Sequence, residues 1–539
     1  MKKIYFNGDF ITLEADNAEA ILIEDRIIKK VGSKEEILSM QDEQTELVNL
    51  KGKTMMPAFI DAHSHFFAVA NNFLQASLDG CKSFKEILEK LLKYKKENNI
   101  EEGKWILANG YDHNILKENK HITKLELDEV LPNNPVVIQH KSGHNGVFNS
   151  LGLKLLEITN KTEAPVGGVI EKKNGELTGY LEENAFIEDI KKVPMPEIEE
   201  LIKSAKKAEK EYASYGITTA QEGMMTKELV PIYKKLVSDN LLDLDIIAFI
   251  DTKAMQKIKE TFPNNIKKYE NNFKIGGIKI FLDGSPQART AWMRTSYIDD
   301  ENYFGYGTMQ NDEVENAIKE ACREDLQILA HCNGDRAAEQ YINSISKEGD
   351  KVKNIRPVLI HGQLLGVDQL KEVKELGIIP SFFIAHTYYW GDVHIKNFGL
   401  DRASKISPAG SAKKNGIKFT FHQDSPVIEP NMFETIWCAV NRTTNLGEIL
   451  EEDERLNVID AIKAVTINSS YQYFEENVKG SIKEGKLANL IIVDKNPLKI
   501  DKEEIRNIQV LETIREGRTI YKRSSKVEKF NSFPTSFAH

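Results

Sequence analysis

The chain has 539 residues, of which 41% are hydrophobic and 29% are charged, and its formal net charge is −10. This composition excludes a disordered or fibrous protein, and the mildly acidic balance argues against broad binding to nucleic acid or to anionic membranes. The four cysteines include no CxxC pair, which argues against a disulfide scaffold or a structural zinc site. Without a signal-peptide core or a run of about 18 apolar residues, we expect a cytoplasmic protein that acts on a small molecule.

Both ends of the chain are rich in short predicted strands separated by turns. Strands are expected within residues 1–55, and again at 490–493 and around the turn at Glu516–Arg518. We therefore predict one small β-domain, a β-sandwich built from both termini, beside a larger body. The predicted domain boundaries are 1–55 and 476–525 for the two parts of the β-domain, 56–475 for the body and 526–539 for a C-terminal tail.

Between these ends, apolar strands alternate with amphipathic helices. In chain order, strands are expected at 56–61, 105–109, 136–140, 275–282, 327–331, 358–361, 378–383 and 419–422. Helices are expected where apolar residues recur at spacings of three and four: 83–98, 196–215, 311–324, 336–347 and 367–376. Near-continuous apolar strands between helices indicate a parallel sheet, so the preferred fold class is α/β with a TIM (β/α)8 barrel. An open doubly wound sheet is the alternative.

Polar residues gather where these strands end. His63 and His65 follow the first strand of the body at a spacing of two, which places both imidazoles on the same side. His331, His361 and Asp424 end or follow three later strands. The carboxyl ends of barrel strands meet at one mouth, so we expect these residues to bind zinc or a similar divalent ion there. Alone, the pair His63 and His65 is a weak signal that two surface histidines would explain more simply.

Lys279 interrupts an otherwise apolar strand. Its stem could be buried while its ammonium group reaches the surface. An ammonium group inside a barrel would instead need a partner or a chemical change, because an unpaired buried charge is costly. Asp283 is the candidate partner.

Several motifs resemble the amidohydrolase superfamily, specifically its YtcJ-like branch, amidohydrolase family 3. The similar segments occur in the family's order, and they are 55–66, 279–285, 331–337, 361–362, 424–427 and 480–490. The resemblance runs from the first strand to about Lys522. It implies a TIM barrel with a β-sandwich formed by both termini.

The resemblance also implies roles for individual residues. The implied metal ligands are His63, His65, Lys279, His331, His361 and Asp424. Asp424 would also act as the proton-shuttling base, and Lys279 falls where family members can carry a carboxylated lysine that bridges two metals. One or two Zn²⁺ ions, or another divalent metal, are therefore expected. His422 and Gln423 depart from the small Gly-Ser pair that usually precedes the base, and Asn489 stands where Asp is usual.

These assignments predict a hydrolase of C–N bonds other than peptide bonds, acting on a small N-acyl or N-substituted amide. Zinc lowers the pKa of its bound water from 15.7 to about 7, and Asp424 would take the proton and pass it to the leaving amine. Ester or cyclic-amide hydrolysis, deamination and decarboxylation at the same site are alternatives. A non-catalytic barrel that binds a metal or ligand is a further alternative, and a homodimer is expected from the family.

Further residues near predicted strand ends are candidates for substrate contact: His113, His144, Arg289, His386 and Trp390. His144 could polarise a carbonyl, Arg289 could hold an anionic group, and His386 with Trp390 could line an apolar pocket. Loop positions, surface pairing and local packing explain the same residues without a function.

Other motifs lack support. Gly480–Lys486 fits the pattern GxxxxGK, but Leu487 replaces the required Ser or Thr and a strand follows it, which excludes a phosphate loop. The absence of GxSxG and HExxH motifs leaves a serine hydrolase and a zincin without support.

Overall fold

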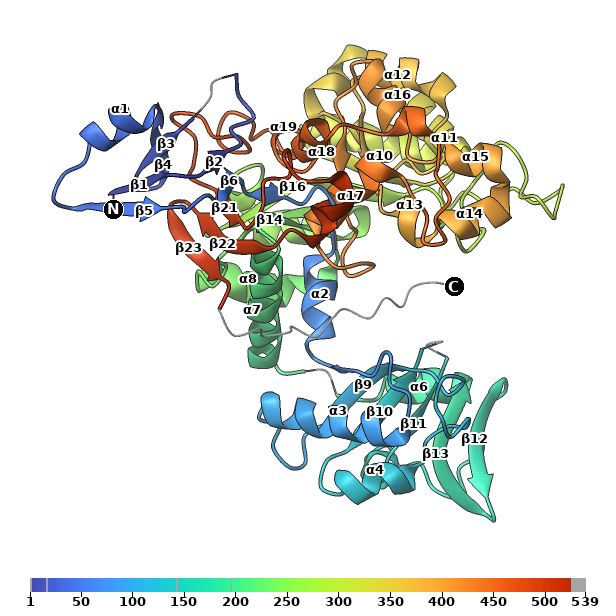
Figure 1. Cartoon of the computed structure of the whole chain (residues 1–539). Coiled ribbons are helices and arrows are strands. Elements are labelled where there is room, and N and C mark those ends of the chain that lie inside the picture. The colour runs from blue at the N-terminus through green and yellow to red at the C-terminus, as the bar shows by residue number, and fades with distance from the viewer. Residues whose placement is uncertain (1, 16–17, 142–143, 195, 525–539) are drawn as a thin grey trace. The chain divides into compact units, whose positions relative to one another are not determined.

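A computed structural model describes residues 2–15, 18–141, 144–194 and 196–524, and the predicted tail at 526–539 lies outside the described residues (Figure 1). The described chain divides into two compact units. Unit 1 comprises residues 2–66 and 208–524, and unit 2 comprises residues 67–207. Of the helices that the structure describes, none has the length and apolar character to cross a membrane.

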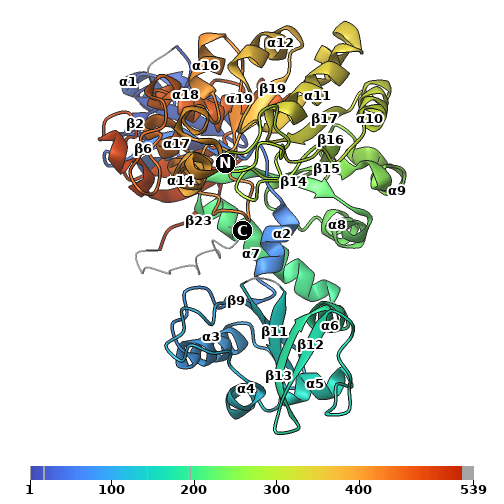
Figure 2. The same cartoon turned by 90° about the vertical axis from the view of Figure 1, so that its right-hand side faces the viewer.

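Unit 1 is built around a curled sheet of eight parallel strands (Figures 1 and 2). In chain order they are β7 (Phe59–Ile60), β14 (Ile217–Met225), β15 (Asp245–Asp251), β16 (Phe273–Phe281), β17 (Gln327–Cys332), β18 (Val358–His361), β19 (Ile379–Phe382) and β20 (Thr420–Phe421). Each strand pairs with its sequence neighbour in this series. Just beyond the ends of β7 and β20, the Asp424 amide donates to the His63 carbonyl at 3.2 Å, and the His65 amide donates to the Ser425 carbonyl at 2.8 Å. This arrangement confirms the expected TIM-like α/β barrel.

Helices that follow the strands cover the outer face of the curled sheet (Figure 2). They include α8 (Val230–Ser238), α9 (Met255–Thr261), α10 (Asn311–Arg323), α11 (Asp335–Ser346) and α12 (Leu370–Glu375). Helix α10 shows why the sequence folds this way, because Val314, Ile318 and Ala321 recur at helical spacing and are fully buried. At its start, the Glu313 carboxylate accepts a hydrogen bond from the Gln310 amide at 2.8 Å.

The interior of the curled sheet is a packed apolar core. Its cluster includes Ile60, Ile247, Leu329, Ile360 and Ile379, which come from five different strands. Burying one such side chain contributes about 1.5–3 kcal/mol. This core fills the interior of the sheet, and the polar residues stand at the carboxyl ends of the strands.

Two strands predicted for the barrel belong to another sheet, so that part of the prediction is wrong. Segments 105–109 and 136–140 form β9 (Ile106–Tyr111) and β10 (Val136–His140) in the sheet of unit 2. Their expected places are taken by β14 and β15. Strand β14 lacks an apolar run because it buries polar side chains such as Gln221 and Glu222, whose polarity hides the strand from a hydrophobicity pattern.

Unit 2 contains a six-stranded sheet in the order β12-β13-β11-β10-β9-β8. Its remaining strands are β8 (Ala76–Ser77), β11 (Asn145–Phe148), β12 (Gly168–Lys173) and β13 (Glu176–Glu183). Strands β8, β9 and β10 are parallel, and the other three extend the sheet as antiparallel neighbours. Helices α3 (Phe84–Glu97) and α4 (Lys124–Val130) contribute Ile87, Leu91 and Leu127 to its core.

The two ends of the chain form two further sheets in unit 1. The first contains β1 (Lys2–Phe6), β3 (Ala20–Glu24), β4 (Ile27–Gly32) and β5 (Thr45–Asn49). The second joins β2 (Asp9–Phe10) and β6 (Thr54–Pro57) to the C-terminal β21 (Leu490–Val493), β22 (Val510–Arg515) and β23 (Arg518–Lys522). One apolar cluster takes Tyr5 and Ile21 from the first sheet and Met55, Leu490 and Ile514 from the second.

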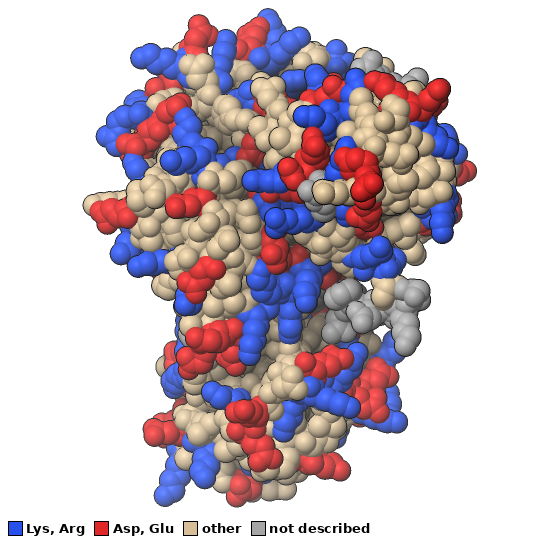
Figure 3. Space-filling view, turned by 90° about the vertical axis from the view of Figure 1, so that its left-hand side faces the viewer, with Lys and Arg blue, Asp and Glu red and all other residues tan. Residues whose placement is uncertain are grey.

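Charged residues of both signs are mixed over most of the face drawn in Figure 3. Many of the described surface charges form ion pairs, such as Lys93–Glu97 on α3 and Lys235–Asp239 at the end of α8. Such exposed pairs contribute about 0–1 kcal/mol each, so they affect solubility more than the fold.

Candidate functional site

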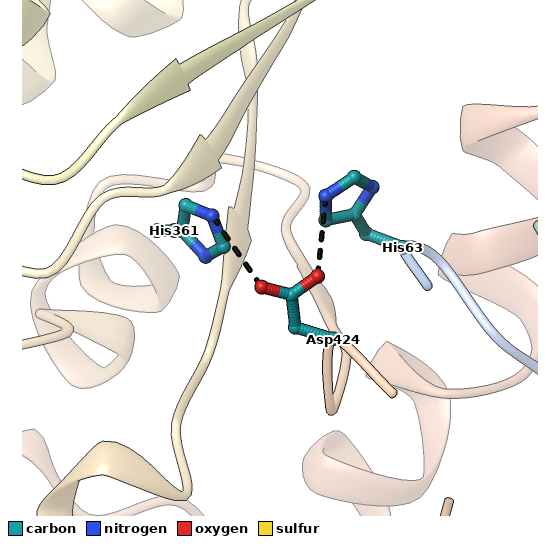
Figure 4. A group of neighbouring side chains, drawn as sticks. All are labelled: His63, His361 and Asp424. Carbon is teal, nitrogen blue, oxygen red and sulfur yellow. Dashed lines mark ion pairs between the residues drawn. The ribbon is translucent and has the colours of Figure 1, made fainter. Parts of the chain in front are cut away.

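The six predicted metal-ligand residues come together at the carboxyl ends of the barrel strands. His63 and His65 follow β7, and Asp424 follows β20. The other three lie within strands: Lys279 in β16, His331 in β17 and His361 at the end of β18. Figure 4 shows the Asp424 carboxylate between the imidazoles of His63 and His361.

Asp424 is the centre of this group. Its Oδ1 atom lies 3.6 Å from His63 Nε2 and 3.4 Å from His65 Nε2, and its Oδ2 atom lies 3.8 Å from His361 Nε2. Ligand atoms of His63, His361 and Asp424 all lie within 4.8 Å of one another. The Lys279 Nζ atom is 3.0 Å from His63 Nε2, and the His331 ring centroid is 4.5 Å from that of His361.

The second nitrogen of each buried imidazole is held by a side chain from another segment of the chain. His63 Nδ1 lies 2.5 Å from Gln221 Oε1, and the Gln221 amide group donates to Tyr473 and to the Ala62 carbonyl. His361 Nδ1 lies 3.1 Å from His422 Nε2. Contacts of this kind fix the ring orientation and leave Nε2 directed into the site, as outer partners of metal-ligating histidines do.

A short chain of polar groups continues behind His361. The second nitrogen of His422, Nδ1, lies 2.9 Å from the Ser381 hydroxyl of β19. His422 therefore connects His361 to the neighbouring strand. The departure from the family's Gly-Ser pair thus places an imidazole where it supports the site.

Asp283 supports His331 rather than Lys279, so its predicted pairing with Lys279 is wrong. Its carboxylate lies 3.2 Å from His331 Nδ1 and accepts hydrogen bonds from the backbone amides of Asn333, Gly334 and Trp292. These contacts satisfy both carboxylate oxygens of Asp283, which follows β16.

Backbone conformation also marks the site. His361 and Asp424 have positive φ angles of 74° and 55°. Such angles cost about 1–3 kcal/mol for residues other than glycine, and they persist where the surrounding structure enforces them, often in active sites.

Burial and neighbouring charges set the protonation states. Burial lowers the pKa values of His63 and His361 well below the ordinary value, so both imidazoles are neutral at pH 7 and offer lone pairs. Burial lowers the pKa of Lys279 to about 7. Burial acts to raise the pKa of Asp424, but the neighbouring side chains, His65 first among them, hold it well below the ordinary value.

This donor set fits a divalent metal ion. Neutral imidazoles and a carboxylate are ligands that zinc and similar ions prefer. The buried Asp424 Oδ1 atom accepts no hydrogen bond in the structure, although two imidazole nitrogens lie within 3.6 Å of it. A bound cation would satisfy this oxygen, since an unpartnered buried carboxylate oxygen is otherwise costly.

Two of the predicted substrate-contact residues lie beside the metal-ligand group. His386 and Trp390 are buried at helix α13 (His386–Tyr389) and just after it, and their ring centroids lie 4.4 Å apart with a tilt of 41°. The Phe383 ring contacts both, and its centroid lies 5.4 Å from that of His422. These rings form an aromatic wall that reaches the site.

The other three make local contacts or belong to unit 2. The Arg289 guanidinium lies over the Tyr297 ring at 5.2 Å. His113 and His144 belong to unit 2, where exposed His144 pairs with Glu183 at 3.1 Å. Their contact with substrate stays a prediction.

Sequence reasoning missed Gln221 and Ser381 as supporting residues. Both are fully buried polar residues inside barrel strands. A buried amide or hydroxyl needs a hydrogen-bond partner, which was the one available signal, but their burial becomes visible only once the strands are placed.

The fold and the strand-end residues together define a barrel enzyme with its polar site at the carboxyl ends of the strands. A family model described as the amidohydrolase family matches residues 46–521. The chain therefore belongs to the amidohydrolase family and is a hydrolase by that membership, as the sequence motifs predicted.

Individual relatives cover nearly the whole chain. "Putative amidohydrolase YtcJ" of Bacillus subtilis (strain 168) is 26% identical over 97% of this chain and 100% of its own. The N-substituted formamide deformylase of Arthrobacter pascens is 26% identical over 96% of this chain and 98% of its own. A solved structure of an uncharacterized metal-dependent hydrolase from Pyrococcus furiosus shares the fold with a TM-score of 0.76, at 24% identity, covering 93% of this chain and 100% of that one.

Proposed function

We propose that this protein is a zinc-dependent amidohydrolase that cleaves the C–N bond of a small N-acyl or N-substituted amide. The observation that carries the proposal is the convergence of neutral imidazoles on an anionic Asp424 whose buried Oδ1 accepts no hydrogen bond. The relation to an N-substituted formamide deformylase supports an amide as substrate.

The residues that would hold the metal are His63, His65, Lys279, His331, His361 and Asp424. Lys279 fits as a carboxylated lysine, since its pKa of about 7 leaves about half of the side chain as a neutral amine at neutral pH. Only the neutral amine can take up carbon dioxide. The resulting carbamate would replace a buried cation by an anionic oxygen ligand for one or two ions.

Bound zinc supplies a Lewis acid and lowers the pKa of a coordinated water to about 7. Asp424, whose carboxylate is ionised at pH 7 and lies within 3.8 Å of three imidazoles, would take the proton of the attacking water. It would then pass this proton to the nitrogen of the leaving amine. The outer partners Gln221, His422 and Asp283 hold the imidazoles in place during this transfer.

The aromatic wall of Phe383, His386 and Trp390 supports an apolar substituent on the substrate. These buried rings offer an apolar surface next to the site, and they would exclude water from one side of the amide. An ester, a cyclic amide or a deamination substrate would use the same groups, so the substrate panel must include them.

We further propose that the two sheets from the chain ends form the family's small β-sandwich, with parts at 1–55 and 476–525 around a barrel domain at 56–475. The shared cluster of Tyr5, Met55 and Leu490 supports this assignment. A cytoplasmic location fits the four cysteines, which are all free. A homodimer without nucleic-acid or membrane partners completes the proposal.

The experiment is a metal and substrate assay on one protein. Metal-free protein is titrated with Zn²⁺, and amine release is followed for N-substituted formamides, other amides, lactams and esters. We expect activity to rise with bound zinc and to be highest for an amide. Full zinc binding without turnover of any compound would contradict the proposal and favour a non-catalytic barrel.

A further inference from the structure

A second group of histidines lies in unit 2, at the carboxyl ends of two neighbouring strands. Strands β9 and β10 are parallel, and after a register shift Tyr111 at the end of β9 pairs with His140 at the end of β10. Asp112 and His113 follow Tyr111 directly. The sheet therefore brings these side chains to one edge, as the barrel does for its own histidines.

The distances within this group are short. His113 Nδ1 lies 3.1 Å from His140 Nε2, which in turn lies 3.6 Å from Asp112 Oδ1. Ligand atoms of all three residues lie within 4.8 Å of one another. In tetrahedral coordination with zinc–nitrogen bonds of about 2.0–2.1 Å, neighbouring ligand atoms are about 3.3 Å apart. The observed spacings bracket this value.

Neighbouring aromatic rings hold the group in shape. The His121 ring stacks on His113 with centroids 4.0 Å apart, and its Nδ1 atom lies 3.0 Å from the Tyr111 hydroxyl. Tyr180 packs against His121 from β13 at 4.4 Å. His140 is buried, whereas Asp112 and His113 are partly exposed, which leaves a route from solvent.

We propose that Asp112, His113 and His140 form a second metal-binding site, in unit 2, for Zn²⁺ or a similar divalent transition ion. Two imidazole nitrogens and one carboxylate oxygen suit such an ion, whereas Mg²⁺ and Ca²⁺ prefer oxygen ligands alone. Three protein ligands leave the fourth position for water. This site goes beyond the proposed hydrolase function, because none of its ligands belongs to the barrel.

The test is the metal content of the full-length protein. Metal-free wild type, a His113→Gln/His140→Gln variant and a His63→Asn/His361→Asn variant are loaded with Zn²⁺, desalted and analysed for zinc per chain. We expect the unit 2 variant to bind one zinc fewer than wild type. We expect the barrel variant to retain one zinc that is lost when both pairs of substitutions are combined.

Two further variants control for folding and for chance surface binding. Asp112→Asn keeps an oxygen that can accept the 2.9 Å hydrogen bond from the Asn114 amide, so it should fold while weakening zinc binding at this site by at least about tenfold. His144→Gln alters an exposed histidine of the same unit and should leave the zinc count unchanged. Equal zinc content and affinity in wild type, Asp112→Asn and the unit 2 double variant would overturn the proposal and leave a hydrogen-bonded histidine pair.

Discussion

The barrel mouth and the unit 2 cluster place histidines in the same way but support them differently. Both groups stand at the carboxyl ends of parallel strands. In the barrel, the outer nitrogens of His63, His331 and His361 meet Gln221, Asp283 and His422 from other segments. In unit 2, His113 and His140 contact each other directly, and ring stacking supplies the support.

On the two proposals above, this difference separates a catalytic site in the barrel from a metal-binding site in unit 2. Outer partners fix the imidazoles of His63, His331 and His361, and an ionised carboxylate lies at the centre of the group. The unit 2 group has a partly exposed carboxylate at its edge instead. Each substitution below tests one side of this contrast.

The largest effect is expected at the centre of the barrel mouth. Asp424→Asn keeps the shape of the side chain but removes the base, so amide turnover should fall by about 10²–10⁴-fold. Zinc should be retained, because the imidazoles remain. Steady-state rates and zinc content measured on the same sample check both points, and unchanged turnover would mean that Asp424 is not the base.

The next largest effect is expected for residues that contact the outer nitrogens of the metal-ligand histidines. Gln221→Leu removes the partner of His63 Nδ1 and should weaken zinc binding in the barrel by about 10–100-fold. The matched change in unit 2 is His121→Phe, which keeps the stacked ring and should weaken its site by less. Competition titrations with a chelator of known affinity measure both, and equal losses would remove the contrast between the two sites.

The lowered pKa of Lys279 makes the stability of the metal-free protein depend on pH. Its pKa falls from 10.5 to about 7 on burial, so between these values the unfolded chain binds the proton and the folded chain does not. The free energy of unfolding of the metal-free protein should therefore rise with pH across this window, by up to about 1.4 kcal/mol per pH unit.

The matched variant is Lys279→Met, which removes this dependence. It should be more stable than wild type at pH 7, and the advantage should shrink as the pH approaches 10. Thermal unfolding midpoints of both metal-free proteins measure it. A constant difference across this range would show that Lys279 keeps its ordinary pKa.

The smallest effect is expected at the surface of unit 2. His144 is 60% exposed, and its ion pair with Glu183 is exposed as well. His144→Gln should change the free energy of unfolding by less than about 0.5 kcal/mol. Denaturant unfolding checks this value, and a loss above 1 kcal/mol would indicate a structural role for this histidine.

The barrel and its metal-ligand candidates could be predicted because their signals are local. The apolar strands β16 to β19 and the polar residues at their ends stand out in the sequence, and His331 and His361 were placed on the correct strands. Helix α3 was also predicted within a residue of its bounds, since Ser83 caps it through the Glu86 amide.

The sheet to which each strand belongs could not be predicted in full. Hydrophobic periodicity reports burial but not which sheet a strand joins, so β9 and β10 were assigned to the barrel. The residues that support the histidines could not be predicted for a related reason. Gln221 contacts His63 only because β14 lies beside β7.

The most direct test of the central claim is amide hydrolysis as a function of zinc bound at the barrel mouth. Metal-free wild type and the His63→Asn/His361→Asn variant are titrated with Zn²⁺ while amine release from an N-substituted formamide is recorded. We expect wild-type activity to rise with bound zinc. The variant should stay inactive, although it still binds zinc in unit 2. Equal activity of the two proteins would contradict the central claim.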